Sequence, residues 1–156
     1  MTDSYETQRN KKRTFIQIKR WLIKHYEGYS PSVEDDNNLS IMYTENGMIY
    51  KLVIQICEST HNIRYFVELP HRIDSCIYEP LIERINSHHL NTCIGRYDLD
   101  PRKGKLRFNY WNSYNPEKLD FDLIDNGMGI AMICCKETFG IIDKGVVRYE
   151  QNSIII

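Results

Sequence analysis

Two adjacent histidines, His88 and His89, are the residues whose type first suggests metal chemistry. Two histidines can hold one ion from a helix when they lie four positions apart, because positions i and i+4 share a face. Adjacent helical residues point about 100° apart instead. The pair lies at the end of a predicted helix, where an imidazolium complements the helix dipole. We therefore predict a structural role for both residues and no metal site.

A second candidate is the carboxylate cluster of Glu34, Asp35 and Asp36. A calcium loop needs acidic ligands at alternating positions, a glycine at the bend and a later glutamate. The cluster lacks this spacing, so we predict a solvated turn. A further option is an inhibitor or immunity-type protein whose acids face a basic toxin.

The cysteines and glycines predict no catalytic or cofactor site. There are five cysteines, an odd number, and none forms a C-x-x-C pair, which favours reduced, packed thiols and a cytoplasmic protein. Gly127 and Gly129 lack the third glycine of a dinucleotide fingerprint. No nucleophile elbow, P-loop or zincin motif is present. We predict a protein that is not an enzyme and has no cofactor; an active site assembled in space from distant residues remains the alternative. The cysteines are Cys57, Cys76, Cys93, Cys134 and Cys135.

Charge is distributed unevenly along the chain. Residues 1–25 hold seven basic and two acidic residues, a net charge of +5, which leaves −6 for the rest of a chain whose total is −1. A basic helix can attract phosphates, so nucleic-acid binding is an alternative function. Blocks of like charge are more often solvated, and no basic surface follows downstream, so we expect no nucleic-acid partner. The residues that this alternative would use are Lys11, Lys12, Arg13, Lys19, Arg20 and Lys24.

Aromatic residues supply the candidate partner surface. Tyrosine occurs 11 times, and its apolar ring and polar tip suit contact surfaces as well as half-buried strand positions. Several aromatic residues lie near the ends of predicted strands, and tyrosine and tryptophan often anchor protein interfaces. The alternative is that most of them belong to the core or its rim. The candidate residues are Tyr50, Phe66, Tyr110, Trp111 and Tyr114.

The elements that would position these residues follow from hydrophobic periodicity. Apolar residues at helical spacing predict a first helix over residues 14–27, ended by Gly28. A short strand over residues 32–34 and three runs of strict alternation predict an antiparallel meander. Asn46 and Gly47 form its strongest hairpin signal, and Pro70 is expected to stop the last strand.

In the second half of the chain, a helix again precedes strands. Asp74 or Ser75 is expected to cap a helix that ends near Leu90, with the regular part beginning near Tyr78 because of Pro80. Two strands around residues 97–110 pair across a polar turn, and a long helix covers about residues 122–150. Its glycines allow close approach to the sheet or mark a kink.

One domain accounts for this order. We predict a flexible segment at residues 1–11, a single α+β domain at residues 12–150 and a tail at residues 151–156. No apolar run approaches the ~18 residues that a membrane span needs, and the start lacks the apolar region of a secretory signal. We therefore expect a cytoplasmic protein without a membrane partner.

The order of elements resembles the YbjN-like family, also called bacterial sensory-transduction regulators. The segment from Ile85 and Asn86 through Ile94-Gly95-Arg96-Tyr97-Asp98-Leu99-Asp100 is similar to that family's central signature. The resemblance implies a bacterial domain similar in fold to class I type III secretion chaperones, with a helix layer against an antiparallel sheet. It implies a binding or regulatory role, often as a dimer, and carries over no catalytic residue.

We therefore predict a non-enzymatic protein-binding domain, a chaperone-like adaptor or regulator. Its partner would be a protein that the sequence does not identify, docked as an extended or helical segment on the sheet or a helix. An isologous homodimer is a further expectation, since symmetric pairs are the commonest oligomers.

Overall fold

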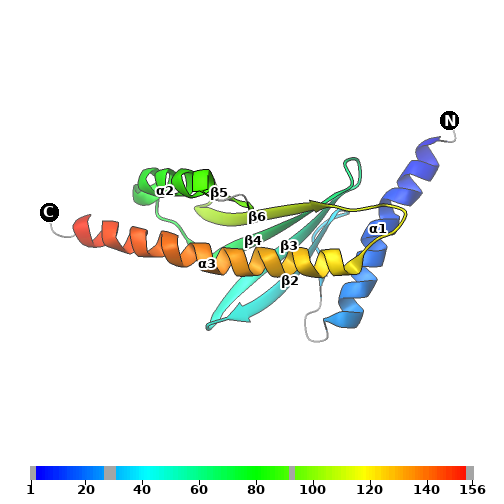
Figure 1. Cartoon of the computed structure of the whole chain (residues 1–156), viewed down its shortest axis with the longest axis horizontal. Coiled ribbons are helices and arrows are strands. Elements are labelled where there is room, and N and C mark those ends of the chain that lie inside the picture. Colours follow the sequence, from blue (N-terminus) through cyan, green and yellow to red (C-terminus); the bar gives the residue numbers. More distant parts are fainter. Residues whose placement is uncertain (1–2, 27–30, 92–93, 154–156) are drawn as a thin grey trace.

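A computed structural model of the chain describes residues 3–26, 31–91 and 94–153, and the side chains of residues 13–26, 31–70, 72–90 and 94–137. Figure 1 shows the elements in space. In chain order they are α1 (Asp3–His25), β1 (Ser32–Val33), β2 (Asn38–Glu45), β3 (Met48–Cys57), β4 (Asn62–Arg72), the short 3₁₀ turn η1 (Ser75–Ile77), α2 (Tyr78–Asn91), β5 (Arg96–Asp100), β6 (Lys105–Ser113) and α3 (Phe121–Ser153).

The strands form one antiparallel sheet in the order β1-β2-β3-β4-β6-β5. Alternate residues of β2, β3, β4, β5 and β6 point to one face, where they pack with residues of the three helices. Figure 1 shows α3 running across this face. Ile18 from α1, Leu81 from α2 and Ile124 from α3 belong to this single core. The other face of the sheet, called the open face below, carries no described helix. The predicted α+β order of helix, meander, helix, hairpin and long helix is confirmed.

The hairpin between β2 and β3 turns at Asn46 and Gly47, as the sequence predicts. Both residues have positive φ, 51° and 76° respectively. A two-residue turn of this kind matches the twist of the strands that it joins. It sets the register in which Tyr43 faces Tyr50 and Ile41 faces Leu52.

The long helix α3 lies against β4 and β6, and one glycine brings it close to the sheet. A Cβ atom on Gly127 would overlap the ring of Tyr65 from β4. Gly127 therefore allows close approach to the sheet, which is one of the two roles that the sequence leaves open for the glycines of this helix. The expected helix over about residues 122–150 is confirmed with slightly wider bounds.

The predicted start of the first helix differs from the structure. The first helix begins at Asp3, so Thr14 lies inside it and residues 3–11 are helical where the sequence predicts a flexible segment. Alanine-poor, charged sequence gives no periodic signal there, but it contains no helix breaker either. The predicted end of this helix at Gly28 lies outside the described residues, as does the last part of the predicted tail, residues 154–156.

The expectation that Pro70 stops its strand is wrong, because β4 continues to Arg72. The register between β4 and β6 shifts between Glu68 and Arg72. Such an irregularity tolerates proline, which has no N–H to donate to the neighbouring strand. Asp74 then accepts a hydrogen bond from the Cys76 N–H at 3.1 Å and caps η1, and α2 begins at Tyr78 as predicted.

None of the helices in the described part of the chain combines the length and the apolar character that a membrane crossing requires.

Candidate protein-binding groove

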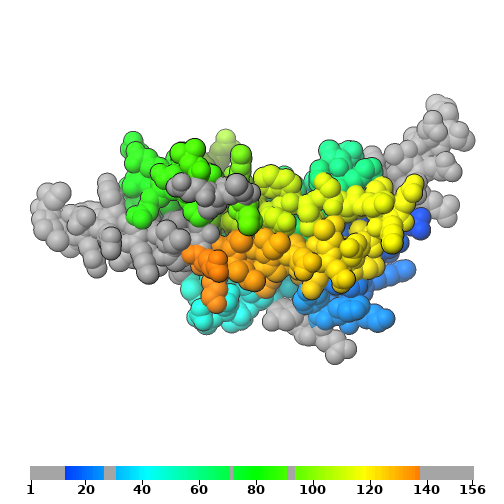
Figure 2. Space-filling view, viewed as in Figure 1, coloured from blue at the N-terminus to red at the C-terminus, as the bar shows by residue number. Residues whose placement is uncertain are grey.

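An apolar groove of about 550 Å³ lies between α3 and the β2–β3 hairpin. In Figure 2 the orange residues of α3 lie directly above the cyan residues of this hairpin. Tyr43 and Leu52 contribute strand side chains, and Met128 and Met132 contribute the helix side. Methionine side chains adapt to differently shaped apolar partners, so this wall suits a contact surface. The full lining is Tyr26, Ile41, Tyr43, Thr44, Glu45, Leu52, Met128, Gly129, Met132, Ile133, Lys136 and Glu137.

Gly129 keeps the helix side of the groove open. A Cβ atom built on Gly129 meets no atom within 4 Å, whereas the same atom on Gly127 would overlap Tyr65. One turn further along, Ile133 is 58% exposed. An exposed isoleucine beside an unfilled glycine position is an apolar surface that a partner can cover.

Polar contacts of α3 lie at both ends of the groove. At one end the Tyr26 hydroxyl donates a short hydrogen bond to Asp125. Burial, together with this bond, raises the pKa of Tyr26 to about 12, so the hydroxyl keeps its proton at neutral pH. At the other end Lys136 Nζ lies 2.6 Å from Glu45 Oε1. This carboxylate raises the pKa of Lys136. The apolar middle of the groove is thus bounded by one tyrosine–carboxylate hydrogen bond and one ion pair.

The strand beside the groove has an open edge. β1 pairs with β2 only at Leu39 and Ser40. No described strand pairs with the outer edge of residues 41–45. In an antiparallel strand every second residue directs its N–H and C=O away from the paired neighbour. This part of β2 therefore offers backbone hydrogen-bonding groups next to the apolar groove.

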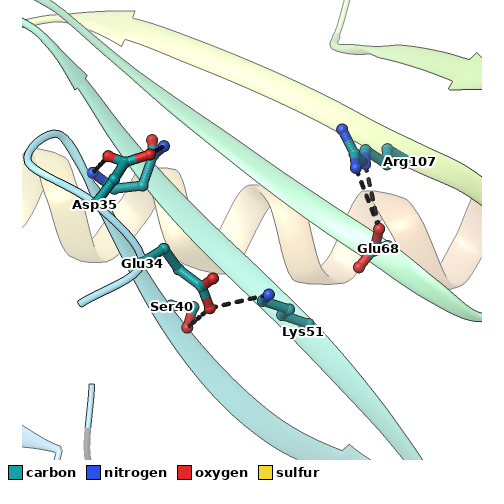
Figure 3. Close-up of polar contacts among 7 residues, drawn as sticks. Glu34, Asp35, Ser40, Lys51, Glu68 and Arg107 are labelled. Carbon is teal, nitrogen blue, oxygen red and sulfur yellow. Dashed lines mark hydrogen bonds and ion pairs between the residues drawn. The ribbon is translucent and has the colours of Figure 1, made fainter. Parts of the chain in front are cut away.

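The open face of the sheet carries charge of alternating sign. Across the strands, Lys51 of β3, Glu68 of β4, Arg107 of β6 and Asp98 of β5 occupy neighbouring register positions. Figure 3 shows Lys51 reaching Glu34 and Arg107 reaching Glu68, with α3 behind the sheet. The distances are 2.9 Å for the first ion pair and 3.3 Å for the second. These two cations are therefore paired with acids.

The structure separates the five aromatic residues that the sequence singles out. Phe66 and Trp111 lie on the open face, where Trp111 is 48% exposed and Arg64 lies 4.7 Å from the Phe66 ring centre. Tyr50, Tyr110 and Tyr114 belong to the other face. Tyr50 stacks on Tyr43 with ring centres 5.2 Å apart, Tyr110 stacks on Tyr65 at 6.0 Å, and Tyr114 is buried. The five therefore do not form one surface, and Tyr50 is the member that packs against the groove wall.

The two histidines have structural positions, as predicted. His89 Nε2 accepts a hydrogen bond from the Tyr97 N–H at 2.8 Å, so α2 anchors the edge strand β5. The expected imidazolium does not suit His89, because an accepting nitrogen must be unprotonated. Burial lowers the pKa of His89, and the positive charge of Arg96 lowers it further. His88 packs its ring against Tyr97 with centres 6.5 Å apart.

Asp35 of the acidic cluster and the thiol of Cys135 are engaged in local structure. Asp35 accepts bonds from the backbone N–H groups of Asn37 and Asn38 at 2.8 and 2.9 Å, which shapes the turn. These bonds lower the pKa of Asp35. Burial raises the pKa of Cys135 to about 12, which keeps this thiol protonated and a poor nucleophile. Among the described residues, no group of three potential metal-ligating side chains comes together.

Sequence reasoning missed the helix side of the groove. Met132 and Ile133 lie next to the buried residues Met128, Ala131 and Cys135 of α3. With Met132 and Ile133 included, the apolar residues of α3 cover more of the helix surface than one contact with a sheet requires. This wide apolar surface and Gly129 are the features of the sequence from which the helix side of the groove could have been predicted. They indicate extra apolar surface but do not say which strand lies opposite.

Comparison with known proteins supports the fold. A chain in the solved structure of the HopA1-SchA chaperone-effector complex matches with a TM-score of 0.55 and 10% sequence identity, over 79% of this chain and 91% of that chain. At this identity the likeness shows a shared fold, and it confirms the predicted chaperone-like α+β architecture. No family model and no curated protein matches the sequence. Membership of the YbjN-like family therefore stays a prediction.

Proposed function

We propose that this chain is a non-enzymatic, chaperone-like adaptor or regulator that binds a segment of another protein. The observation that carries the proposal is the apolar groove between α3 and the β2–β3 hairpin. The shared fold with a chain of a chaperone-effector complex supports it, because that protein assembles with another protein. A cytoplasmic location, a bacterial source and a symmetric homodimer are part of the same proposal.

The bound segment is extended. A strand added beside residues 41–45 of β2 would pair with backbone groups that no described strand uses. Alternate side chains of the added strand would then point toward α3, where Met132 and Ile133 offer apolar contacts. Backbone bonds give affinity in this mode, and the groove selects apolar side chains at every second position.

Gly129 offers a test that leaves the fold intact. Gly129→Trp places a large ring into the groove from a position where a Cβ meets nothing. Gly129→Ala is the matched control, because it changes the same helix position but adds only a methyl group. Both substitutions replace glycine by a better helix former, so neither should unfold α3.

The experiment is affinity capture from native-host lysate with wild type and both variants, followed by mass spectrometry. We expect one protein to be retained by wild type and by Gly129→Ala at low and at raised salt. Gly129→Trp should lose it. Equal retention by Gly129→Trp, with circular dichroism showing a folded protein, would contradict binding in the groove.

A further inference from the structure

A second hollow, of about 590 Å³, lies between α1 and the connector that leads into α3. In Figure 2 the blue residues of α1 lie beside the yellow residues that begin α3. Its lining differs in character from that of the apolar groove, and the two share no residue. The lining consists of Arg13, Gln17, Arg20, Trp21, Lys24, His25, Pro116, Glu117, Leu119 and Phe121.

Three cations line this basic hollow from one side of α1. Arg13, Arg20 and Lys24 are separated by seven and four positions, which places them within about 40° of one another around the helix axis. All three side chains are exposed. Among the residues whose side chains are described, none of the three forms an ion pair with a carboxylate. Glu117 is the acid in the lining, so the hollow is positively charged in a chain of net charge −1.

The aromatic residues in the hollow are already in contact with one another. Trp21 stacks on Phe121 with ring centres 5.4 Å apart and on His25 at 5.3 Å. The His25 ring nitrogen Nδ1 also lies 3.1 Å from the Trp21 carbonyl oxygen. These contacts fix the floor of the hollow and take up the stacking surface of the indole. A nucleic-acid base would need such a surface to be free.

We propose that the basic hollow binds an acidic peptide segment of a partner protein. Arginine guanidinium groups match carboxylates in charge and geometry. Arg13 and Lys24 are about 16 Å apart along the helix axis, which corresponds to about five residues of extended peptide at 3.3 Å each. A strand with acids at every second position presents carboxylates about 6.6 Å apart, close to the rise of about 6 Å between Arg20 and Lys24. This site is additional to the apolar groove and does not depend on it.

Fluorescence anisotropy tests the proposal with a labelled peptide in which glutamates alternate with serines. The control peptide has glutamine in place of glutamate, and a single-stranded oligonucleotide is the competing anion. We expect the 156-residue chain to bind the acidic peptide at low salt, to bind the glutamine peptide much less, and to prefer the acidic peptide to the oligonucleotide.

Variants of α1 locate the site. Arg20→Gln should weaken binding of the acidic peptide about fivefold, and the double variant Arg13→Gln/Arg20→Gln about twentyfold. Lys19→Gln removes a charge from the same helix outside the lining and should leave the affinity unchanged. Gly129→Trp should also bind the acidic peptide as wild type does, which separates this site from the groove.

Two results would overturn the proposal. One is equal affinity of wild type and of the folded double variant for the acidic peptide. The other is tighter binding of the oligonucleotide than of the peptide, which would assign the basic helix to nucleic acid.

Discussion

Gly127 and Gly129 lie two positions apart in α3 and face different surroundings. Gly127 packs against the Tyr65 ring in the core, whereas Gly129 faces the groove. Sequence alone predicts that both weaken the helix, and that the glycines of this helix allow close approach to the sheet or mark a kink. It does not distinguish them, because the distinction depends on where the sheet lies.

The two alanine substitutions should therefore change stability in opposite directions. We expect Gly129→Ala to raise the free energy of unfolding by about 0.5–1 kcal/mol, since alanine restricts the unfolded chain and meets no atom. Gly127→Ala should lower it by about 1–3 kcal/mol, because the added methyl group must displace Tyr65. Urea unfolding of both variants measures the difference. A stabilised Gly127→Ala would contradict the described packing of α3.

His89 should make folding stability depend on pH. Its pKa in the folded chain is lowered from 6.5 by burial and by the charge of Arg96. As the pH falls below 6.5, the unfolded chain binds a proton at this position before the folded chain does, so stability is lost. Above that pH the contribution is fully present.

We expect His89→Gln to reduce this pH dependence, because glutamine can accept the Tyr97 N–H bond without titrating. The measurement is the urea midpoint at about pH 7.5 and about pH 5.5. His88→Gln is the control and should keep the wild-type dependence. An unchanged dependence in His89→Gln would show that His89 is not the titrating group.

At the scale of elements, the β2–β3 hairpin is specified by its turn. Gly47 has a φ of 76°, which costs a residue with a Cβ about 1–2 kcal/mol. Gly47→Ala should lower the free energy of unfolding by about 1 kcal/mol, whereas Asn46→Gly should change it by less than about 0.5 kcal/mol. Equal effects of the two substitutions in urea unfolding would contradict a turn of this type.

The strands were predictable because local rules determine them. Alternation of Leu39, Ile41 and Tyr43 indicates a half-buried strand, and Asn46 with Gly47 fixes the register across the turn. The continuation of β4 past Pro70 was not predictable, since proline is tolerated only through an irregularity in pairing with β6. That pairing joins strands far apart in the sequence.

At the scale of the whole molecule, the groove arises from the position of α3 across the sheet. The apolar residues of β2 were predictable as core, and Met132 and Ile133 as part of a helix. The open groove between these residues was not predictable, because its width depends on how far α3 lies from the open edge of β2. The basic hollow was predictable in part, since the cations of α1 share a helical face, but the connector that completes it follows β6, far from α1 in the sequence.

The two proposed sites should respond differently to salt. Binding in the groove depends on apolar burial and should persist as salt is raised. Binding of an acidic peptide in the basic hollow depends on exposed charges, and its affinity should fall because salt screens them. Anisotropy of the acidic peptide, compared with retention of the captured protein across the same salt range, measures both responses. Parallel loss of both would indicate a single electrostatic site.

The most direct test of partner binding in the groove is site-specific photo-crosslinking in native-host lysate. A photoreactive phenylalanine analogue at position 133 lies in the groove, and the same analogue at position 82 lies on the exposed side of α2. We expect the analogue at position 133 to form a covalent adduct with one partner polypeptide, through residues of an extended segment, and the analogue at position 82 to form none. An adduct at position 82 but not at position 133, or none at either position, would contradict a partner segment in the groove.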